Sequence, residues 1–255
     1  MNKIIFLGQK PLGEKCFDIL LKLQTANFSV IGVVSNKSKN VWWKSNRIYK
    51  RILGTSIKFI DNDKPNEKKI YDLIIDNNIN TIISVQHSWI LSNKILNSVS
   101  GFAFNLHNAK LPDYKGNNIF SHIILNGEKS HTSTIHFMSK EVDMGDIIIE
   151  KATEIDSKET SKSLYKKANE NALNTFKIFI KSLKNQKVFE KTPIKHSGMF
   201  YNRNSLNGLK EIHNIQDFNE VDRKSRAFFF EPFEPAFYRI RGKKFYILPE
   251  CYFDS

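Results

Sequence analysis

Residues 3–35 have the sequence KIIFLGQKPLGEKCFDILLKLQTANFSVIGVVS, and this stretch decides the fold. KIIFLG (3–8) is a short apolar run, and EKCFDILLKLQ (14–24) has its apolar residues at helical spacing. FSVIGVVS (28–35) is a second apolar run, rich in β-branched residues. A strand, a helix and a second strand in this order predict a β-α-β unit, whose two strands lie parallel in one sheet.

The same alternation continues along the chain. Further strands are predicted at 56–60, 81–86, 102–107, 133–139 and 146–155. Further helices are predicted at 68–78, 93–99, 118–128 and about 161–184. This pattern is typical of an α/β fold in which helices cover both faces of a mostly parallel sheet.

Beyond Pro193 the sequence becomes rich in turn residues and then in aromatic residues. We therefore expect a boundary near residue 190. It divides the chain into a first domain of residues 1–190 and a small C-terminal module of residues 191–255. Within this module, RGKK (241–244) is predicted to form the turn of a β-hairpin.

The chain has 255 residues and a formal net charge of +13, from 39 Lys and Arg against 26 Asp and Glu. This excess predicts an anionic partner, either nucleic acid, an acidic membrane surface or a phosphorylated small molecule. The most basic stretch, 166–187, has helical apolar spacing, so we interpret it as an amphipathic helix with a solvated lysine face.

Cysteine usage and hydropathy indicate the compartment. Cys16 and Cys251 form neither a metal-binding spacing nor a disulfide framework. The N-terminal apolar run is too short for a signal peptide, and no apolar window is long enough to span a membrane. We expect a cytoplasmic protein with no membrane contact.

The first loop contains Gly8 and Gly13, spaced as in a phosphate-binding P-loop. Glu14 and Lys15 follow, however, where a P-loop requires a lysine and then a hydroxyl residue. The three-glycine dinucleotide fingerprint is also absent. We interpret the loop as a turn from strand to helix. The alternative is a phosphate held by amides at the helix N-terminus, with Lys10 nearby.

FNLHNAKLPDYKG (104–116) carries the main functional signal. In an extended segment Asn105 and His107 project from one face, at the carboxyl end of a strand, where parallel α/β sheets bind ligands. Downstream, KEVDMGDIIIE (140–150) places Asp143 in a tight loop before a strand. An amide to stabilise an oxyanion, an imidazole to move a proton and a carboxylate to orient it together suit acyl transfer to an amine.

Simpler interpretations remain open for each of these residues. An Asn at a strand end is often a cap, a His there is often packed, and D-M-G-D is often a plain turn. A metal site is another alternative, with the candidate ligands His107, His122, His131, His136 and Asp143. Their spacing matches neither HExxH nor a paired Cys/His site, so we expect no metal.

Four segments together resemble the formyltransferase superfamily: NLHNAKLPDYKG (105–116), LNGE (125–128), TIHFM (134–138) and VDMGDI (142–147). This group includes glycinamide ribonucleotide transformylase, methionyl-tRNA formyltransferase and the sugar-nucleotide N-formyltransferases. Its signature N-x-H-x-x-x-L-P-x-[YW]-[RK]-G is followed by an aspartate in D-x-G, and here Asp143 lies 36 residues after His107 (143 − 107). The resemblance covers most of the first domain. It implies a Rossmann-like formyltransferase domain with Asn105, His107 and Asp143 as its catalytic trio.

The resemblance also implies 10-formyltetrahydrofolate as the formyl donor. SVQHSWILS (84–92) is similar to the cofactor loop of the family, and the pterin is expected between this loop and residues 140–143. By similarity, the folate contacts are Gln86, Trp89, Ile90, Leu91, Lys140 and Val142. Thr132 replaces a glycine that is usual in the family, and Lys115 replaces an arginine, so the acceptor side is expected to differ in shape.

The C-terminal module resembles the linker and tail of sugar-nucleotide N-formyltransferases, with Asp222, Arg223, Arg226, Ala227 and Phe228 in the matching pattern. This implies an acceptor amine on a nucleotide-linked amino-dideoxy sugar, either dTDP-4-amino-4,6-dideoxyglucose or its 3-amino isomer. Such sugars enter surface polysaccharide, for example the O-antigen of lipopolysaccharide, and enzymes of this group form homodimers. By similarity, the substrate contacts are Gln9, Lys10, Trp43, Tyr201 and Arg203.

Several alternatives remain. Trp43, in NVWWKS (40–45), is equally well interpreted as a surface aromatic residue in a loop. For the whole protein, the alternatives are a methionyl-tRNA formyltransferase-like enzyme, a formyltetrahydrofolate hydrolase and a nucleotide-sugar sensor without catalysis. We expect the sugar enzyme, with no nucleic-acid partner.

Overall fold

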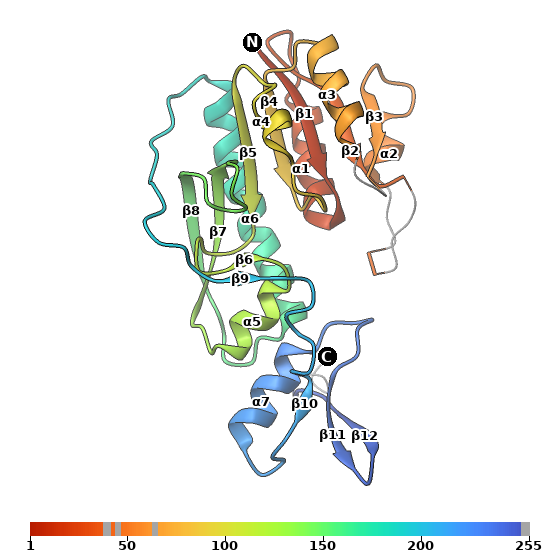
Figure 1. Cartoon of the computed structure of the whole chain (residues 1–255), viewed down its shortest axis with the longest axis vertical. Helices are drawn as coiled ribbons and strands as arrows, with labels where there is room; N and C mark the ends of the chain where they lie inside the picture. Colours follow the sequence, from red (N-terminus) through yellow and green to blue (C-terminus); the bar gives the residue numbers. More distant parts are fainter. Residues whose placement is uncertain (38–41, 44–46, 63–65, 251–255) are drawn as a thin grey trace.

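A seven-stranded sheet forms the centre of the computed structural model, which describes residues 1–37, 42–43, 47–62 and 66–250 (Figure 1). The strand order is β3-β2-β1-β4-β5-β7-β8. The bounds are β1 (Asn2–Gly8), β2 (Phe28–Ser35), β3 (Lys58–Asp61), β4 (Thr81–Val85), β5 (Phe102–His107), β7 (Ser130–Phe137) and β8 (Ile147–Glu154). The strands β1 to β5 are parallel, whereas β7 pairs antiparallel with both β5 and β8. The predicted α/β fold with a mostly parallel sheet is confirmed.

Helices cover both faces of the sheet because its strands bury side chains on both sides. On one face, Ile4 and Phe6 of β1 share a core with α1 (Lys10–Lys22) and α6 (Ser161–Lys184). On the other face, Ile5 and Leu7 of the same strand pack in a core with α3 (Glu67–Asp76) and α4 (Asn93–Leu96). The short helix α2 (Arg47–Ile52) joins the first of these cores.

The turn from β1 to α1 is tighter than the sequence indicates. The helix begins at Lys10, which has a φ of 61°, so Gln9 alone separates strand and helix. Gly13 consequently lies inside the helix and not in a loop. A Cβ atom at this position would lie 3.2 Å from the carbonyl oxygen of Val85, which shows how closely α1 approaches the strand ends. The first glycine pair therefore belongs to a close helix–sheet contact.

The chain after α6 returns to the first domain before it enters the C-terminal module. The short strand β9 (Phe200–Tyr201) pairs in parallel with β6 (Lys115–Gly116), which follows β5 and precedes α5 (Ile119–Leu125). We refer to residues 197–203 as the strap, because they lie across the loop that follows β5 (Figure 1).

The C-terminal module contains a helix that the sequence analysis did not predict. Its three-stranded sheet has the order β10-β11-β12, formed by β10 (Glu211–Ile212), β11 (Ala236–Ile240) and β12 (Lys243–Ile247). The predicted hairpin turn joins β11 to β12. Helix α7 (Phe218–Ala227) ends immediately before the aromatic run 228–230. The side chain of Asp217 caps it by accepting from the amides of Asn219 and Glu220.

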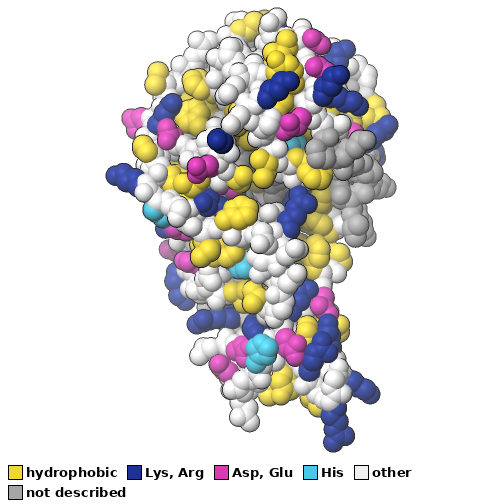
Figure 2. Space-filling model, in the orientation of Figure 1, with side chains coloured by type: hydrophobic (Ala, Val, Ile, Leu, Met, Phe, Trp, Pro, Cys, Tyr) yellow, Lys and Arg dark blue, Asp and Glu magenta, His cyan; other side chains and the backbone are white. Residues whose placement is uncertain are grey.

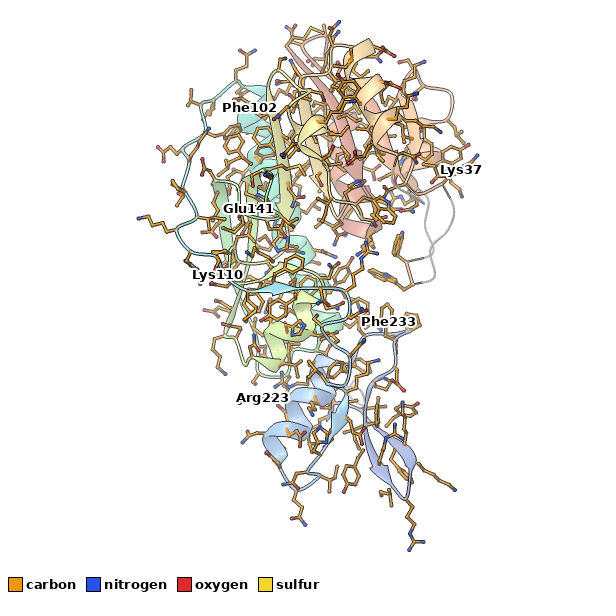
Figure 3. The ribbon with its side chains drawn as sticks, viewed as in Figure 1. Lys37, Phe102, Lys110, Glu141, Arg223 and Phe233 are labelled. Atoms are coloured by element: carbon orange, nitrogen blue, oxygen red, sulfur yellow. The ribbon has the colours of Figure 1, made fainter. Side chains whose placement is uncertain are left out.

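The module docks against the start of α6. The amide of Lys162 donates to the carbonyl of Phe229 at 3.2 Å, and the guanidinium of Arg226 donates to the carbonyl of Glu159 at 3.1 Å. Phe233 lies where the module meets the first domain (Figure 3). These contacts fix the module relative to the sheet.

On the face that Figure 2 displays, Lys and Arg side chains of the described residues are scattered and interspersed with acidic residues, and they form no single stripe. Among the described residues, no helix combines the length and the apolar character that crossing a membrane requires.

Candidate active site

Strand β5 places Asn105 and His107 at the carboxyl end of the parallel part of the sheet. Asn105 pairs with Ser84 of β4 on one side and with His136 of β7 on the other. Because the two residues are two positions apart in one strand, their side chains emerge on the same face. This local geometry brings both within reach of a loop between β7 and β8.

That loop carries Asp143, and the structure brings the three predicted catalytic residues together. The Nδ2 atom of Asn105 donates to Oδ1 of Asp143 at 3.4 Å, and Nδ1 of His107 lies 3.6 Å from Oδ2. The amide of Gly116 donates to the same Oδ2 at 3.2 Å. Asp143 has a φ of 55°, a conformation that costs energy for a residue with a Cβ atom. The loop thus holds the carboxylate in contact with its partners.

The surroundings of Asp143 favour its charged form. Burial alone raises the pKa of this carboxyl group, but the charge of His107 acts in the opposite direction. Contacts with His136 and the hydrogen bond from the Gly116 amide also lower the pKa. The net result is a pKa well below the ordinary value for aspartate, so the site contains a buried carboxylate.

Hydrogen bonds assign a tautomer to each histidine of the site. Nε2 of His107 lies 2.6 Å from the carbonyl oxygen of Tyr114 and therefore carries a proton, so Nδ1 is the atom that faces Asp143. In His136, Nδ1 donates to the carbonyl of Phe137 at 2.8 Å, so Nε2 accepts from Asn105 at 3.1 Å. The Asn105 amide thereby donates to two acceptors.

His136 is a member of this network that the sequence analysis considered only as a metal ligand. Its Nε2 lies 3.6 Å from Oδ1 of Asp143, and the side chain is 2% exposed. The signal lies in the antiparallel register of β5 and β7, which sets His136 opposite Asn105. Among the described residues, no cluster of His, Cys, Asp and Glu has the arrangement of a metal site.

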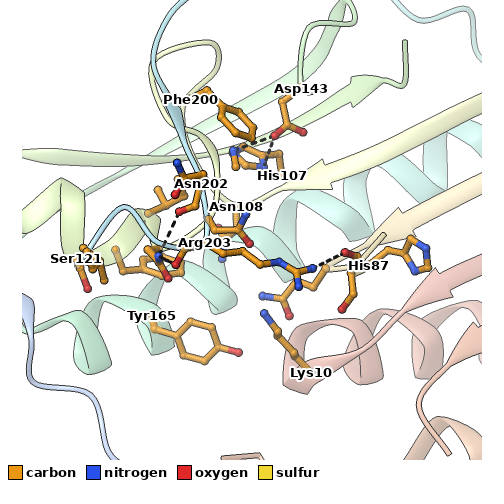
Figure 4. Close-up of a pocket in the computed structure, with 18 of the residues that line it drawn as sticks. Lys10, His87, His107, Asn108, Ser121, Asp143, Tyr165, Phe200, Asn202 and Arg203 are labelled. Atoms are coloured by element: carbon orange, nitrogen blue, oxygen red, sulfur yellow. Dashed lines mark hydrogen bonds and ion pairs between the residues drawn. The ribbon is translucent and has the colours of Figure 1, made fainter. Parts of the chain in front are cut away.

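The trio lies in a cleft of about 1570 Å³ between the carboxyl ends of the strands, the strap and the C-terminal module (Figure 4). Two cations, Lys10 at the start of α1 and Arg203 from the strap, project into this cleft. Burial and then the charge of Arg203 lower the pKa of Lys10. Within the described part of the chain neither cation is paired with a carboxylate. This arrangement favours an anionic ligand.

Hydrogen bonds hold Arg203 and Gln9, the neighbour of Lys10, against the loop after β4. Arg203 donates to the carbonyl of Ser88 at 2.8 Å and lies over the ring of Trp89, 5.6 Å from its centroid. Gln9 donates to the hydroxyl of Ser88 and accepts from Asn62 at 3.4 Å. The loop after β4 is thus tied to the ends of β1 and β3 and to the strap.

Most of the other predicted contacts line the same cleft. These are Gln9, Lys10, Trp43, Gln86, Trp89, Ile90, Leu91, Val142 and Arg203. Lys140 instead lines an adjoining depression beside Phe102 and Met138. Residues 40, 41, 44 and 45 of the predicted aromatic segment lie outside the described residues.

The structure places Tyr201 away from the cleft lining. Its ring stacks on His122 with a centroid distance of 4.0 Å and on Tyr114 with a distance of 5.7 Å. The neighbouring Phe200 lines the cleft. Adjacent residues of a strand point to opposite sides, so the strap can present only one of the two rings to a ligand.

The formyl transferase family model matches residues 2–180. A bifunctional polymyxin resistance protein ArnA from Wigglesworthia glossinidia brevipalpis is 31% identical over 169 residues, which are 65% of this chain and 25% of that protein. A methionyl-tRNA formyltransferase from Clostridioides difficile is 24% identical over 226 residues, 84% of this chain and 72% of that enzyme. This chain thus spans a quarter of the first relative's length.

One solved structure covers nearly the whole chain. It is an N-formyltransferase from Helicobacter canadensis, crystallised in complex with folinic acid and dTDP-3-aminofucose. The match has a TM-score of 0.75 and 24% identity, and it covers 96% of this chain and 86% of that one. The two proteins share a fold that includes the C-terminal module.

Proposed function

This chain belongs to the formyl transferase family, and on that premise we propose that it transfers a formyl group from 10-formyltetrahydrofolate to the amine of a nucleotide-linked amino-dideoxy sugar. The observation that carries the proposal is the position of Asn105, His107 and Asp143 in one cleft with the cations Lys10 and Arg203. The trio suits the chemistry, and the cations suit a diphosphate beside it.

The residues of one cleft wall fit a folate. Oε1 of Gln86 and both ring nitrogens of His87 are buried and have no hydrogen-bond partner among the described residues. Burial lowers the pKa of His87 to about 4, so the ring is neutral at physiological pH. Leu91 and Val142 add apolar surface. A pterin offers flat apolar faces that suit the apolar surface of Leu91 and Val142, and a hydrogen-bonding edge that suits a polar cleft wall.

The residues that we propose to bind the formyl donor are therefore those predicted from the sequence. We assign Gln86, Trp89, Ile90, Leu91 and Val142 to folate contacts inside the cleft. Lys140 is assigned to the part of the folate that reaches the adjoining depression. When bound, this substrate supplies an activated formyl group. The acceptor sugar supplies the amine, and residues of the chain bind both substrates, stabilise the oxyanion and move the proton.

Each catalytic residue has a stated atom and task in this proposal. The Asn105 amide donates to the formyl oxygen as negative charge develops there, exchanging its longer hydrogen bond to Asp143 for this one. Nδ1 of His107 takes the proton that the amine loses and passes it to the departing folate nitrogen, since Nε2 is committed to the carbonyl of Tyr114. Oδ2 of Asp143, 3.6 Å from Nδ1, stabilises the imidazolium.

The assignment of the residues that bind the acceptor rests on the position of the strap and on similarity to a solved structure. The similar Helicobacter canadensis enzyme was crystallised with a dTDP-linked amino sugar, and this chain shares its C-terminal module. We propose that Gln9, Lys10 and Arg203 bind the diphosphate and that Trp43 contacts the nucleotide base. For Tyr201 we propose indirect support of the strap, because its ring packs on Tyr114 and His122.

The product's use, the compartment and the oligomeric state follow from the same proposal. A formylated dTDP-sugar is a precursor of surface polysaccharide such as O-antigen, made in the cytoplasm by a homodimeric enzyme. The rival candidate is a methionyl-tRNA formyltransferase, favoured by the relative that covers 84% of this chain and by the net charge of +13. Binding of tRNA that weakens steeply with salt would support this rival.

An acceptor screen tests the proposal. The purified chain is incubated with 10-formyltetrahydrofolate and with dTDP-4-amino-4,6-dideoxyglucose, its 3-amino isomer or methionyl-tRNA. Formylated product is detected by mass spectrometry. We expect product with one of the dTDP-sugars and a loss of about 10²–10⁴-fold in the His107→Ala variant. Product with methionyl-tRNA alone, or folate turnover without any acceptor, would reject the sugar assignment.

A further inference from the structure

Phe200 is a large apolar side chain that lies half exposed beside the buried ionic groups of the trio. Its side chain is 51% exposed and lines the cleft. Figure 4 shows its ring next to Asp143 and His107. A ring in this position exposes apolar surface to water until a ligand covers it. The folded chain therefore forgoes the free energy that burial of this surface would provide.

The strap fixes the position of this ring. The backbone of Phe200 lies in β9, between two hydrogen bonds to β6 and its flank. The Lys115 amide donates to the Met199 carbonyl at 3.0 Å, and the Asn117 amide donates to the Tyr201 carbonyl at 2.7 Å. On the other side of the strand, the Tyr201 ring is stacked on Tyr114. The backbone of Phe200 is therefore held over the loop, and the ring starts from a Cα position that the β6–β9 pair fixes.

The ring covers the backbone that holds the carboxylate. A Cβ atom on Gly116 would lie 3.1 Å from Cε2 of Phe200, so the ring sits directly against this glycine. The amide of the same Gly116 donates to Oδ2 of Asp143 at 3.2 Å. Phe200 thus screens from water the hydrogen bond that holds Asp143 beside His107.

We propose that Phe200 is a positioning residue that keeps water away from the formyl carbon and so couples formyl loss to an acceptor amine. This inference rests on the proposed function. In the productive reaction, a bond forms between the acceptor nitrogen and the formyl carbon, the bond from that carbon to the folate nitrogen breaks, and the amine proton passes to that nitrogen.

Water can attack the same carbon. The carbon–nitrogen bond to the folate then breaks, one proton of the water passes to the folate nitrogen, and formate is released. An apolar ring at the rim excludes water from the reaction centre without a charge or hydrogen-bonding group of its own.

The test measures how formyl groups are partitioned. With dTDP-4-amino-4,6-dideoxyglucose or its 3-amino isomer, formate and formylated sugar are quantified for the wild type, Phe200→Ala, Phe200→Leu and the control Phe218→Ala. Phe218 is 78% exposed on α7 and outside the cleft lining. We expect the ratio of formate to formylated sugar to rise about tenfold in Phe200→Ala. Phe200→Leu should restore most of the coupling, and Phe218→Ala should behave as the wild type.

Three results separate this inference from the proposed function. A wild-type enzyme that releases formate without acceptor rejects the proposed function itself. A Phe200→Ala variant that loses transfer but keeps the wild-type partition ratio overturns the inference, because the ring would then act only in acceptor binding. A Phe200→Leu variant as uncoupled as Phe200→Ala also overturns it, since apolar cover would not be the relevant property.

Discussion

Asp143 accepts hydrogen bonds from Asn105 and the Gly116 amide, and it faces His107. Its pKa is lowered, so the folded state prefers the charged carboxylate. The stability this provides is fully present above the unfolded pKa of about 4 and is lost as the pH falls below about 4 toward the folded pKa. The free energy of unfolding should therefore drop more steeply below this pH in the wild type than in Asp143→Asn.

At neutral pH we expect Asp143→Asn to lower the free energy of unfolding by about 1–3 kcal/mol. Formyl transfer should fall by about 10²–10⁴-fold, because the imidazolium loses its counter-charge. Urea unfolding between about pH 7 and pH 3 and a transfer assay check both effects. Asp146→Asn, in the same loop, is the matched control. Equal pH dependence in the wild type and Asp143→Asn would contradict the role given to this carboxylate.

The sequence predicted that Asn105, His107 and Asp143 lie together, but it did not predict that His136 joins them. Strand alternation places Asn105 and His107 on one face, and resemblance to the formyltransferase signature indicated Asp143. His136 joins them only because β7 runs antiparallel to β5 in a register that sets it opposite Asn105. Register between distant strands depends on the whole sheet, and no local pattern reveals it.

The orientation of the side chains in the strap also could not be predicted from the sequence. Residues 197–203 contain a two-residue strand, too short for any periodicity to predict which ring faces the cleft. Resemblance indicated Tyr201, whereas the β6–β9 pairing turns Phe200 toward the cleft. Helix α7 was missed because it ends directly before the aromatic residues 228–230, which are typical of a strand, although the Asp217 cap favours a helix.

Gly198, near the start of the strap, lies too close to the loop after β5 for a residue with a Cβ atom. It has a φ of 59°, and a Cβ atom there would lie 2.0 Å from the carbonyl oxygen of Pro112. Gly198→Ala must therefore displace the strap from the loop, and we expect a loss of about 2–4 kcal/mol in the free energy of unfolding. Formyl transfer should also fall, because Arg203 and Phe200 lie on the same segment. Urea unfolding and the transfer assay measure both changes.

Gly54→Ala provides the control for this prediction. Gly54 also has a positive φ, 77°, but nothing lies within 4 Å of its added Cβ atom. This variant should show only the conformational cost of about 1 kcal/mol and should keep full activity. If the two variants were equally stable and equally active, the close approach of Gly198 to Pro112 would have no influence on the site.

The cleft is assembled from all parts of the chain. Lys10 comes from the first strand–helix turn, the trio from the centre of the sheet and Arg203 from the strap, while Phe230 and Phe233 reach it from the C-terminal module. The sequence predicted the division into a large domain and a small module. That both parts line one cleft depends on docking contacts such as that between Lys162 and Phe229, which involve backbone groups and leave no sequence pattern.

The C-terminal sheet leaves apolar surface exposed on one face. Tyr238 pairs with Phe245 and Ile240 pairs with Lys243, so Ile240 and Phe245 lie on the same face. They are 50% and 49% exposed. Phe245 lies on β12, which is an edge of its sheet within the described residues, and Ile240 lies on the neighbouring strand β11. An edge strand with apolar neighbours is a favourable surface for a second copy of the chain.

We therefore expect the protein to be a homodimer that loses its partner in Phe245→Asp, since a charge at this position opposes burial. Light scattering coupled to size exclusion should give twice the chain mass for the wild type and one chain mass for the variant. Leu53→Asp, at a position 60% exposed on the first domain, should remain dimeric. Because the proposed catalytic residues Asn105, His107 and Asp143 all come from one chain, turnover per chain should change little in Phe245→Asp. A monomeric wild type, or a dimeric Phe245→Asp, would show that this sheet is not the interface.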